Sequence, residues 1–407
     1  MWEIRTITDD DADLFRSRLS RGFGGDIDSD DSAAERFRSI FEYDRTLAVF
    51  EQGDIVGTGA AFSLGVTAPG GVEVPMAGTT VISVQPTHRR RGVLRELMDR
   101  HLEDVTDRGE PLAGLWASES SIYGRFGYGP STFRYSTEID TPTVKMSDPP
   151  AKRSVRLIDS EDAESMMRSV YEAVRPTRPG MLTRSDPWWT HRLMADPESW
   201  RGGKSAHRYL VFEEDGSPTG YATYRQKEKW EDFVAGGEIR VTEVIAADPN
   251  AHKGIWAFLT NIDLFNKLEW WNLPLDDALP NIITDQRRVR RRLVDALWVR
   301  VMDVTAALEA RGYEHDGTVT IEVIDPTRFQ AAGTYRLEVV DGVAACDRTS
   351  ASAELRLGAD VLGHLYLGGG NAIAMADAGR IEGDPVAVAR LHRIFRTDRA
   401  PWCPEVF

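Results

Sequence analysis

Three consecutive arginines and a glycine stand where an apolar run gives way to a helical pattern. The apolar run covers residues 79–84, the basic turn covers residues 87–95, and residues 96–102 have helical spacing. We therefore predict a strand, a basic glycine turn and a helix, in that order. A helix that begins in such a turn presents unpaired backbone N–H groups and the positive end of its dipole. Such ends bind anions, most often phosphate, and arginines add charge-assisted donors. The turn is a candidate site for a phosphate-bearing cofactor.

A second candidate segment, residues 117–130, holds three glycines among aromatic residues. Glycines let the backbone turn tightly and pass close to a ligand. Each aromatic residue here is either a packing residue around the bend or, for Tyr123, a functional hydroxyl. The strand predicted at 112–116 precedes this segment and should lie beside the strand that ends at Val84. Ser118 and Tyr123 are then expected at the mouth of the cofactor site.

Composition restricts the class of protein. The chain has 407 residues, of which 42% are hydrophobic and 28% charged, which predicts a globular protein of two or three domains. Its net charge of −15 argues against a nucleic-acid partner. An acidic surface serves solubility alone or attracts cationic substrates. The two distant cysteines, Cys346 and Cys403, fit neither a disulfide framework nor a zinc site. The two cysteines and the charged beginning of the sequence predict a cytoplasmic protein. The lack of a long apolar run predicts that it has no membrane span.

The chain contains a faint internal repeat. Residues 4–12 are echoed by residues 155–163, and each copy is an alternating strand followed by an acidic helix start. Residues 242–254 resemble residues 80–92, but the arginines of the turn have gone. We interpret the second module as a copy of the first that has lost strong phosphate binding.

Prolines and polar residues predict a linker at 141–150. The arginine-rich run at 287–292 is typical of a solvated face, or it sits against an acidic surface. Beyond this run, apolar spacing from Leu297 to Leu308 predicts a helix that Gly312 ends. The remaining pattern predicts an α+β third part, with strands at 319–323, 334–339 and 353–357 and helices at 359–367 and 386–395.

The basic turn at 88–95, together with residues 117–119 and 122–130, resembles the Eis (enhanced intracellular survival) family of GNAT acetyltransferases. The likeness covers the whole chain and includes the aromatic ending at 401–407. One position departs from the general GNAT pattern, because Leu94 stands where a small residue is usual, and Eis-like sequences share a bulky residue there.

The resemblance implies an α+β fold with two fused GNAT modules and a sterol-carrier-like third domain. Combined with the division seen in the sequence, it gives a catalytic, acetyl-CoA-binding module at 1–148, a degenerate second module at 149–290, and a sterol-carrier-like domain at 291–407 that supplies the C-terminal carboxylate. Family members form hexamers, so a homohexamer is expected.

The resemblance also implies acetyl-CoA as cofactor and suggests which residues bind it. Ser118 and Glu119 would flank its reactive end. Backbone groups of Ile82, Ser83 and Val84 would face the pantetheine and thioester. The pyrophosphate would lie on the turn and helix start formed by Arg90, Arg91, Gly92, Val93, Leu94 and Arg95.

The implied chemistry is direct acetyl transfer to an amine in a ternary complex. Tyr123 matches the general acid of the family and would protonate the departing sulfur, whose thiol titrates near about 8.5. A backbone N–H near Val84 would stabilise the oxyanion. The proton acceptor of the family is the chain's own terminal carboxylate, here that of Phe407. Such a group titrates at roughly 3.3–3.7 in water and is a weak base unless burial or a relayed water assists it.

Whether that carboxylate can act depends on the tail. Chain ends are usually frayed, but Trp402, Val406 and Phe407 favour a docked tail. A docked tail would bring Glu405 near the reaction as a substrate contact.

The acceptor is less specified by the sequence. The acidic run at 26–31, beginning with Asp26, either attracts a polycationic amine or is an exposed helix cap. Family members acetylate aminoglycosides and lysine side chains, which makes a polycationic amine the expected acceptor. The alternative function is an acyl-CoA or lipid carrier without transferase activity, with apolar strands of the third part lining a cavity. Release of CoA in the presence of a cationic amine separates the two.

Overall fold

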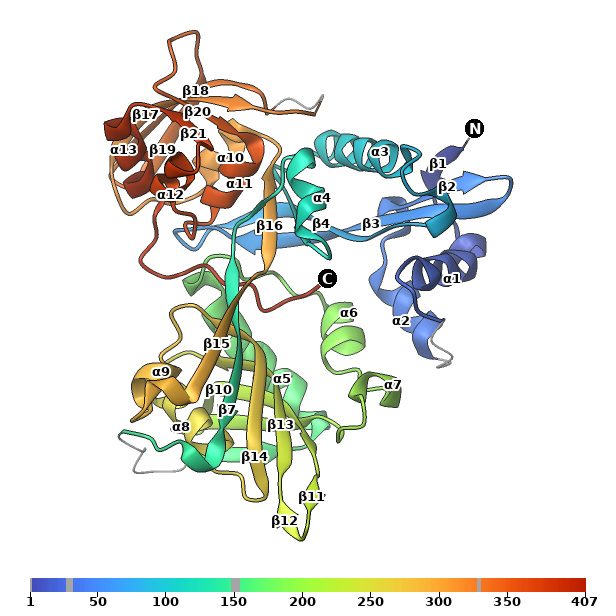
Figure 1. Cartoon of the computed structure of the whole chain (residues 1–407), viewed down its shortest axis with the longest axis vertical. Coiled ribbons are helices and arrows are strands. Elements are labelled where there is room, and N and C mark those ends of the chain that lie inside the picture. The colour runs from blue at the N-terminus through green and yellow to red at the C-terminus, as the bar shows by residue number, and fades with distance from the viewer. Residues whose placement is uncertain (1, 27–31, 148–153, 328–330) are drawn as a thin grey trace. The chain divides into compact units, whose positions relative to one another are not determined.

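The structure is a computed structural model that describes residues 2–26, 32–147, 154–327 and 331–407. It divides into two units, each built from separate stretches of chain (Figure 1). Unit 1 consists of Met1–Thr132, Pro179–His191 and Ala296–Phe407, and unit 2 consists of Phe133–Arg178 and Arg192–Asp295. No helix in the described parts of the chain combines the length and the hydropathy needed to cross a bilayer.

The first sheet of unit 1 has seven strands in the order β1-β2-β3-β4-β5-β16-β6. β4 and β5 are parallel, and the other neighbours are antiparallel. The predicted strand at 79–84 is the second half of β4, and the prediction that residues 112–116 lie beside it is confirmed. The strands are β1 (Glu3–Thr6), β2 (Thr46–Glu51), β3 (Asp54–Thr67), β4 (Glu73–Val84), β5 (Leu112–Trp116), β6 (Gly129–Pro130) and β16 (Leu297–Val301).

Helix α3 (Val93–Asp107) joins β4 to β5 and buries one apolar stripe against the sheet. Val93, Leu97, Leu102 and Val105 are buried at the spacing expected for one helix face. The other helices of this part of unit 1 are α1 (Ala12–Gly22), α2 (Ser32–Ile40), α4 (Ser120–Tyr123) and α6 (Asp186–Trp188), with 3-10 turns at Asp9–Asp11, Tyr43–Arg45, Pro86–His88 and Gly124–Phe126.

The late part of unit 1 has a five-stranded sheet in the order β19-β18-β17-β20-β21, flanked by short helices (Figure 1). Its predicted α+β character is confirmed. The elements are β17 (Gly317–Ile324), β18 (Gly333–Val340), β19 (Val343–Arg348), β20 (Leu355–Gly358), β21 (Ile381–Gly383), α10 (Val304–Ala310), α11 (Ala359–Tyr366), α12 (Ala372–Asp377) and α13 (Pro385–Phe395).

The prediction of one helix from Leu297 to Leu308 is wrong in its first half. Residues 297–301 form β16, which lies between β5 and β6, and the helix begins only at Val304. All five residues of β16 are buried. A strand covered on both faces is apolar at nearly every position, so its pattern also fits a helix. Asp303 marks the true start, because its side chain accepts a hydrogen bond from the Ala306 N–H at 3.0 Å.

Unit 2 repeats the pattern of the first sheet. Its order, β8-β9-β10-β13-β14-β7-β15, has a single parallel pair, β13 and β14, at the place that β4 and β5 hold in unit 1. The predicted repeat therefore corresponds to β1–α1 and β8–α5, and to β4–α3 and β13–α8. The strands are β7 (Phe133–Asp140), β8 (Val155–Ile158), β9 (Arg208–Glu214), β10 (Ser217–Lys227), β13 (Gly237–Ala246), β14 (Phe265–Pro274) and β15 (Val289–Asp295).

Several short elements complete unit 2. A separate ribbon contains β11 (Trp230–Glu231) and β12 (Val234–Ala235). Residues 148–150 of the predicted linker lie outside the described residues. The helices are α5 (Ser160–Val174), α7 (Glu198–Arg201), α8 (Pro249–Leu259) and α9 (Leu279–Ile282), with 3-10 turns at Thr141–Thr143, Arg175–Thr177 and Gln286–Arg288, and a π-helical stretch, Trp189–Leu193, crosses from unit 1 into unit 2.

Candidate active site

The parallel strands β4 and β5 separate at the place where the cofactor site is predicted. They pair only at residues 76–78 of β4, opposite residues 112–114 of β5. β4 then continues to Val84, while the end of β5 pairs with β16 on its other side. The two strands therefore form a wedge with its vertex at Gly78. Ile82, Ser83 and Val84 lie on the β4 side of this wedge, with backbone groups on an edge that β5 does not occupy.

A bulge in β4 shapes that edge. Val81 has a φ of +48°, and the register between β3 and β4 shifts between Thr58 and Ala60. A β-branched residue in the left-handed region is a real outlier, which costs on the order of 1–3 kcal/mol. The Thr58 hydroxyl compensates in part, because it donates a hydrogen bond to the Val81 carbonyl at 2.8 Å. Bulges bend a strand and redirect its edge. Sequence reasoning missed this feature, since nothing in residues 79–84 marks it.

The basic turn adopts the conformation that an anion site requires. Arg90 and Gly92 both have left-handed backbones, with φ of +63° and +97°. Gly92 is the N-cap of α3 and no side chain caps the helix. A Cβ added at Gly92 would meet nothing within 4 Å, so the space above the helix start is open. The side chains of Arg90, Arg91 and Arg95 are exposed around it, whereas Val93 is buried below it. These features fit the pyrophosphate of acetyl-CoA.

The arginines of the turn make different contacts. Arg89 donates to the Val84 and Gly22 carbonyls, at 3.3 and 3.2 Å, and so holds the turn against the end of β4. Arg91 lies 3.5 Å from the Glu51 carboxylate. Leu94, the departure from the usual glycine motif, is half-buried and packs against the apolar cluster that contains Tyr123.

Tyr123 ends α4 and is buried in that cluster with residues of α3 and β16. Ser118, which is exposed, forms a hydrogen bond with its hydroxyl, and Glu119 is the N-cap of α4. Burial raises the pKa of the Tyr123 hydroxyl above its usual range, and the bond with Ser118 opposes part of that rise. The hydroxyl is therefore protonated at neutral pH, which is the state a proton donor needs.

A buried polar chain lies beside Tyr123. The Tyr128 ring meets the Tyr123 ring edge-on at 6.2 Å, and its hydroxyl is 3.1 Å from the Thr79 hydroxyl. The Thr79 hydroxyl is in turn 2.7 Å from His101 Nε2 on α3. Burial lowers the pKa of His101 to about 3 and raises the pKa of Tyr128 to about 12, so both groups are neutral. This chain ties β4 to α3, and a histidine on an apolar helix face was its one sequence signal.

The C-terminal tail is docked rather than frayed. Residues 401–405 are buried, and Val406 and Phe407 are half-buried. The Phe407 ring lies 3.3 Å from the position that a Cβ of Gly78 would take. Because Gly78 is the last β4 residue paired with β5, the chain ends at the vertex of the wedge.

A cavity of about 440 Å³ adjoins this vertex. Leu64, which lines the cavity, is also the nearest side chain to the Gly78 Cβ position, next to Phe407. The cavity has aromatic walls, with the Phe62 and Trp188 rings 5.4 Å apart. It also contains carboxylates from three different segments, Glu42, Glu73 and Glu110. These residues are spread along the chain, so no local motif could have revealed them.

Glu42 and Glu110 are held in place by hydrogen bonds from the protein. Glu42 accepts hydrogen bonds from the Ser63 N–H and hydroxyl, both at 2.6 Å. Glu110 pairs with the buried guanidinium of Arg45 through two bonds of 2.9 and 2.6 Å. The set of carboxylates nevertheless exceeds the cations that line the cavity, because Arg184 is the one basic residue among its described lining residues.

The two predicted acceptor contacts, Asp26 and Glu405, are not among the residues that line this cavity. Asp26 is exposed beyond α1, and residues 27–31 of the acidic run lie outside the described residues. Glu405 is buried, and its carboxylate accepts bonds from Arg184 and from Trp188 Nε1. Those two donors line the cavity, so Glu405 stands behind its wall.

Unit 2 lacks the open helix start of unit 1. At the equivalent position, Asp248 is the N-cap of α8 and accepts hydrogen bonds from the Asn250 and Ala251 N–H groups at 2.8 and 3.0 Å. A carboxylate on the helix start repels phosphate and occupies its donors. This supports the interpretation that the second module has lost phosphate binding.

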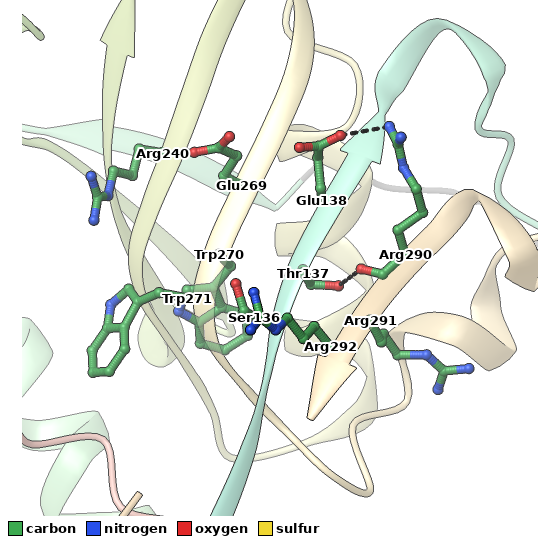
Figure 2. A pocket seen from close by; sticks show the side chains of 10 residues that line it. All are labelled: Ser136, Thr137, Glu138, Arg240, Glu269, Trp270, Trp271, Arg290, Arg291 and Arg292. Atoms are coloured by element: carbon green, nitrogen blue, oxygen red, sulfur yellow. Dashed lines mark hydrogen bonds and ion pairs between the residues drawn. The ribbon is translucent and has the colours of Figure 1, made fainter. Parts of the chain in front are cut away.

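The arginine run lines a different cavity, of about 530 Å³, on the sheet of unit 2 (Figure 2). Arg290, Arg291 and Arg292 on β15 are exposed, as expected of a solvated face. Across the sheet, Arg240 is paired in register with Glu269, and Glu138 with Arg290. The Arg290 guanidinium is 2.7 Å from the Glu138 carboxylate (Figure 2). The run thus belongs to a mixed-charge sheet surface.

Comparison with known proteins agrees with this fold. Residues 3–131 and 180–301 match family models described as acetyltransferase (GNAT) domains, and residues 304–404 match a sterol carrier protein domain. An uncharacterized N-acetyltransferase of Streptomyces avermitilis is 41% identical over 408 residues, which cover 100% of this chain and 99% of that protein. The N-acetyltransferase Eis of Mycobacterium tuberculosis is 36% identical over 355 residues, 85% of this chain and 84% of that protein.

Solved structures show the same architecture. The crystal structure of Eis1 from Mycobacterium abscessus superimposes with a TM-score of 0.85 at 29% identity and covers 100% of both chains. A GCN5-related N-acetyltransferase from Anabaena variabilis, at 20% identity, has the same fold with a TM-score of 0.86 over 100% of both chains. The fold and the wedge thus define a GNAT N-acetyltransferase with two GNAT domains and a sterol carrier domain. More narrowly, the chain belongs to the Eis family of N-acetyltransferases.

Proposed function

We propose that this enzyme transfers an acetyl group directly from acetyl-CoA to an amine of a polycationic acceptor, such as an aminoglycoside or a lysine side chain, within a ternary complex. The observation that carries the proposal is the docking of Phe407 at the vertex of the β4–β5 wedge, beside a cavity rich in carboxylates. The proposal assigns the terminal carboxylate, the cavity and Tyr123 to one reaction at this wedge.

The chain's own groups hold the cofactor in this proposal. When bound, acetyl-CoA supplies an acetyl group activated as a thioester. The backbone edge at Ile82, Ser83 and Val84 holds the pantetheine arm. The uncapped start of α3, from Gly92 to Leu94, holds the pyrophosphate together with the exposed Arg90, Arg91 and Arg95. Ser118 and Glu119 flank the reactive end.

Tyr123 is the proposed proton donor. Its burial keeps the hydroxyl protonated at neutral pH, and Ser118 orients it through their hydrogen bond. Donation of this proton to the departing sulfur prevents a thiolate from leaving into an apolar site.

The α-carboxylate of Phe407 is the proposed proton acceptor. An ammonium group must lose a proton before its nitrogen can attack, so a base has to lie close to the acceptor amine. The carboxylate receives that proton directly or through one water. The contact of the Phe407 ring with Gly78 supports a carboxylate held near this wedge.

The cavity beside Phe407 is the proposed acceptor site. Its carboxylates favour a cation, and the Phe62 and Trp188 rings offer faces over which an ammonium group binds. Asp26, at the start of the acidic run, would extend this attraction toward the entrance. Glu405 would influence the acceptor only indirectly, through Arg184 and Trp188, which it binds and which line the cavity.

Release of CoA measured over a panel of amines tests the proposal. We expect release with polycationic amines and none with neutral alcohols. Tyr123→Phe, and a chain with one residue added after Phe407, should each lower kcat by about 10²-fold or more while acetyl-CoA binding is unchanged. Tyr366→Phe is the matched control, because this buried hydroxyl donates to the Ala307 carbonyl far along the sequence from the site. Wild-type turnover in both site variants would show that neither Tyr123 nor the terminal carboxylate takes the proposed role.

We also propose three further properties of the chain. They are a division of the chain near residues 148 and 290, a homohexameric assembly and a cytoplasmic location. Matches to three domain models in the same order support the division. Light scattering on the purified protein tests the assembly, and its failure leaves the chemistry of the single chain intact.

A further inference from the structure

A short stretch of chain, Pro179–His191, leaves unit 2 and is built into unit 1. Its backbone pairs side by side with the last residues of β3. The Gly180 N–H donates to the Thr67 carbonyl and the Thr67 N–H to the Met181 carbonyl, both at 2.8 Å. The Thr183 N–H donates to the Gly65 carbonyl, also at 2.8 Å. We call residues 179–191 the strap. It supplies one wall of the carboxylate cavity, through Thr183, Arg184, Ser185 and Trp188.

The C-terminal tail is joined to the strap by a buried polar contact. The Glu405 carboxylate pairs with the Arg184 guanidinium through one oxygen and accepts the Trp188 Nε1–H through the other, at 2.9 Å. The side chains of Arg184 and Glu405 are 0% and 5% exposed. Removing one partner of such a buried ion pair strongly destabilises the fold, because the remaining charge is buried without compensation.

Backbone contacts reinforce this junction. The Trp402 N–H donates to the Pro179 carbonyl at 2.8 Å. Gly180 has a φ of +92°, and a Cβ there would lie 2.9 Å from the Trp402 carbonyl oxygen, so tail and strap run in close contact. The Cys403 thiol bonds the Glu405 carbonyl at 3.3 Å. Two residues after Glu405, the Phe407 ring reaches Gly78.

We propose that Glu405 is a positioning residue that joins the acceptor cavity to the terminal carboxylate. It holds the tail through Arg184 and Trp188, and these same residues form the cavity wall. The placement of the proton acceptor and the shape of the acceptor site are therefore coupled. This inference rests on the proposed function, because it assigns the carboxylate of Phe407 a role in the reaction. It gives Glu405 no contact with the substrate.

The coupling has a reciprocal consequence. If the fixed strap holds the tail, then a cationic ligand that fills the cavity against the strap also stabilises the docked tail. The state of the tail can be measured without turnover, because carboxypeptidase A removes an exposed C-terminal phenylalanine. We expect slow release of Phe407 from the wild-type enzyme and still slower release when a polycationic amine is bound without acetyl-CoA.

Glu405→Gln is the first test. It removes the charge that pairs with Arg184 and keeps nearly the same volume. We expect release of phenylalanine at least about tenfold faster, with kcat lower by roughly 10- to 100-fold, since a misplacement of about 1 Å costs up to about 10²-fold. Acetyl-CoA binding should be unchanged. Glu338→Gln is the matched control, because Glu338 pairs with Arg336 in an exposed contact on β18.

Trp188→Phe is the second variant, because it removes one bond to Glu405 and leaves no buried charge unpaired. We expect smaller changes in the same directions for both readouts. If phenylalanine is released from both variants no faster than from the Glu338→Gln control, Glu405 does not hold the tail on the strap and the proposal is overturned. Faster release with wild-type kcat overturns the positioning role. Failure of the proposed function itself is recognised separately, when the chain extended after Phe407 keeps its full turnover.

Discussion

Burial decides the protonation of the side chains around Tyr123. Tyr123, Tyr128 and His101 all lie in one apolar environment, and desolvation favours the neutral form of each. For Tyr123 the result is a hydroxyl that keeps its proton for the reaction. For His101 the result is an imidazole that accepts or donates one hydrogen bond to Thr79 and carries no charge. The same physical cause therefore serves chemistry in one residue and packing in another.

The buried His101 predicts a loss of stability in acid. Its pKa is about 3 in the native state, against about 6.5 in the unfolded chain. Between these values the unfolded chain binds a proton that the native chain does not. The free energy of unfolding therefore falls as the pH drops from about 6.5 toward 3, by up to about 1.4 kcal/mol per pH unit.

Denaturant unfolding at pH 7 and pH 5 measures this effect. The wild-type enzyme should lose more stability between the two pH values than His101→Gln does. His315→Gln, at an exposed position, is the control and should behave as the wild type. Equal losses in wild type and His101→Gln would show that His101 is charged in the native state.

At the scale of elements, two helices with the same place in a repeated sheet pattern differ at their first residue. α3 starts at Gly92 with an open, left-handed backbone, whereas α8 starts at Asp248 with a carboxylate on its N–H groups. The start of α3 leaves its N–H groups open to a phosphate, whereas the Asp248 carboxylate already occupies those of α8. In our proposal, this difference at the N-cap distinguishes the cofactor-binding module from a copy that no longer binds phosphate.

Gly92→Ala should weaken acetyl-CoA binding. A φ of +97° disfavours any residue with a Cβ, so alanine shifts the turn or strains it by about 1 kcal/mol. We expect the KM for acetyl-CoA to rise about tenfold with little change in kcat. Gly109→Ala is the control, because Gly109 follows α3 with a φ of +69° and an added Cβ there also meets nothing within 4 Å. A similar rise in KM for both variants would mean that general strain, and not the turn, is responsible.

At the scale of the whole molecule, unit 1 is assembled from parts distant in sequence. β16, which comes after unit 2 in the chain, completes the sheet and packs Trp298 into the cluster around Tyr123. Arg300 on β16 is fully buried, pairs with Asp325 at 2.7 Å and donates to the Phe126 carbonyl at 2.6 Å. The late part of the chain thereby holds the segment that contains Tyr123.

Arg300→Met should destabilise unit 1 strongly. It leaves Asp325 buried without its counter-charge, which costs about 3–5 kcal/mol. The unfolding midpoint of unit 1, followed by Trp fluorescence, should fall while Arg336→Met, in an exposed pair with Glu338, leaves it nearly unchanged. A small effect of Arg300→Met would indicate that water reaches Asp325 in solution.

The sequence alone determined the features that depend on neighbours along the chain. The basic turn, the segment with Tyr123, the repeat and most elements of the late part follow from periodicity, glycines and caps, which act over a few residues. Tertiary structure decided the rest. The run from Leu297 to Leu308 fits a helix or a buried strand. Residues 297–301 form a strand because their backbone pairs with β5 on one side and β6 on the other. Glu42, Glu73 and Glu110 meet in one cavity, and Glu405 finds Arg184 and Trp188, because folding brings together segments that share no local pattern. Charges that are distant in sequence interact only through space, so their partners become known when the chain is folded.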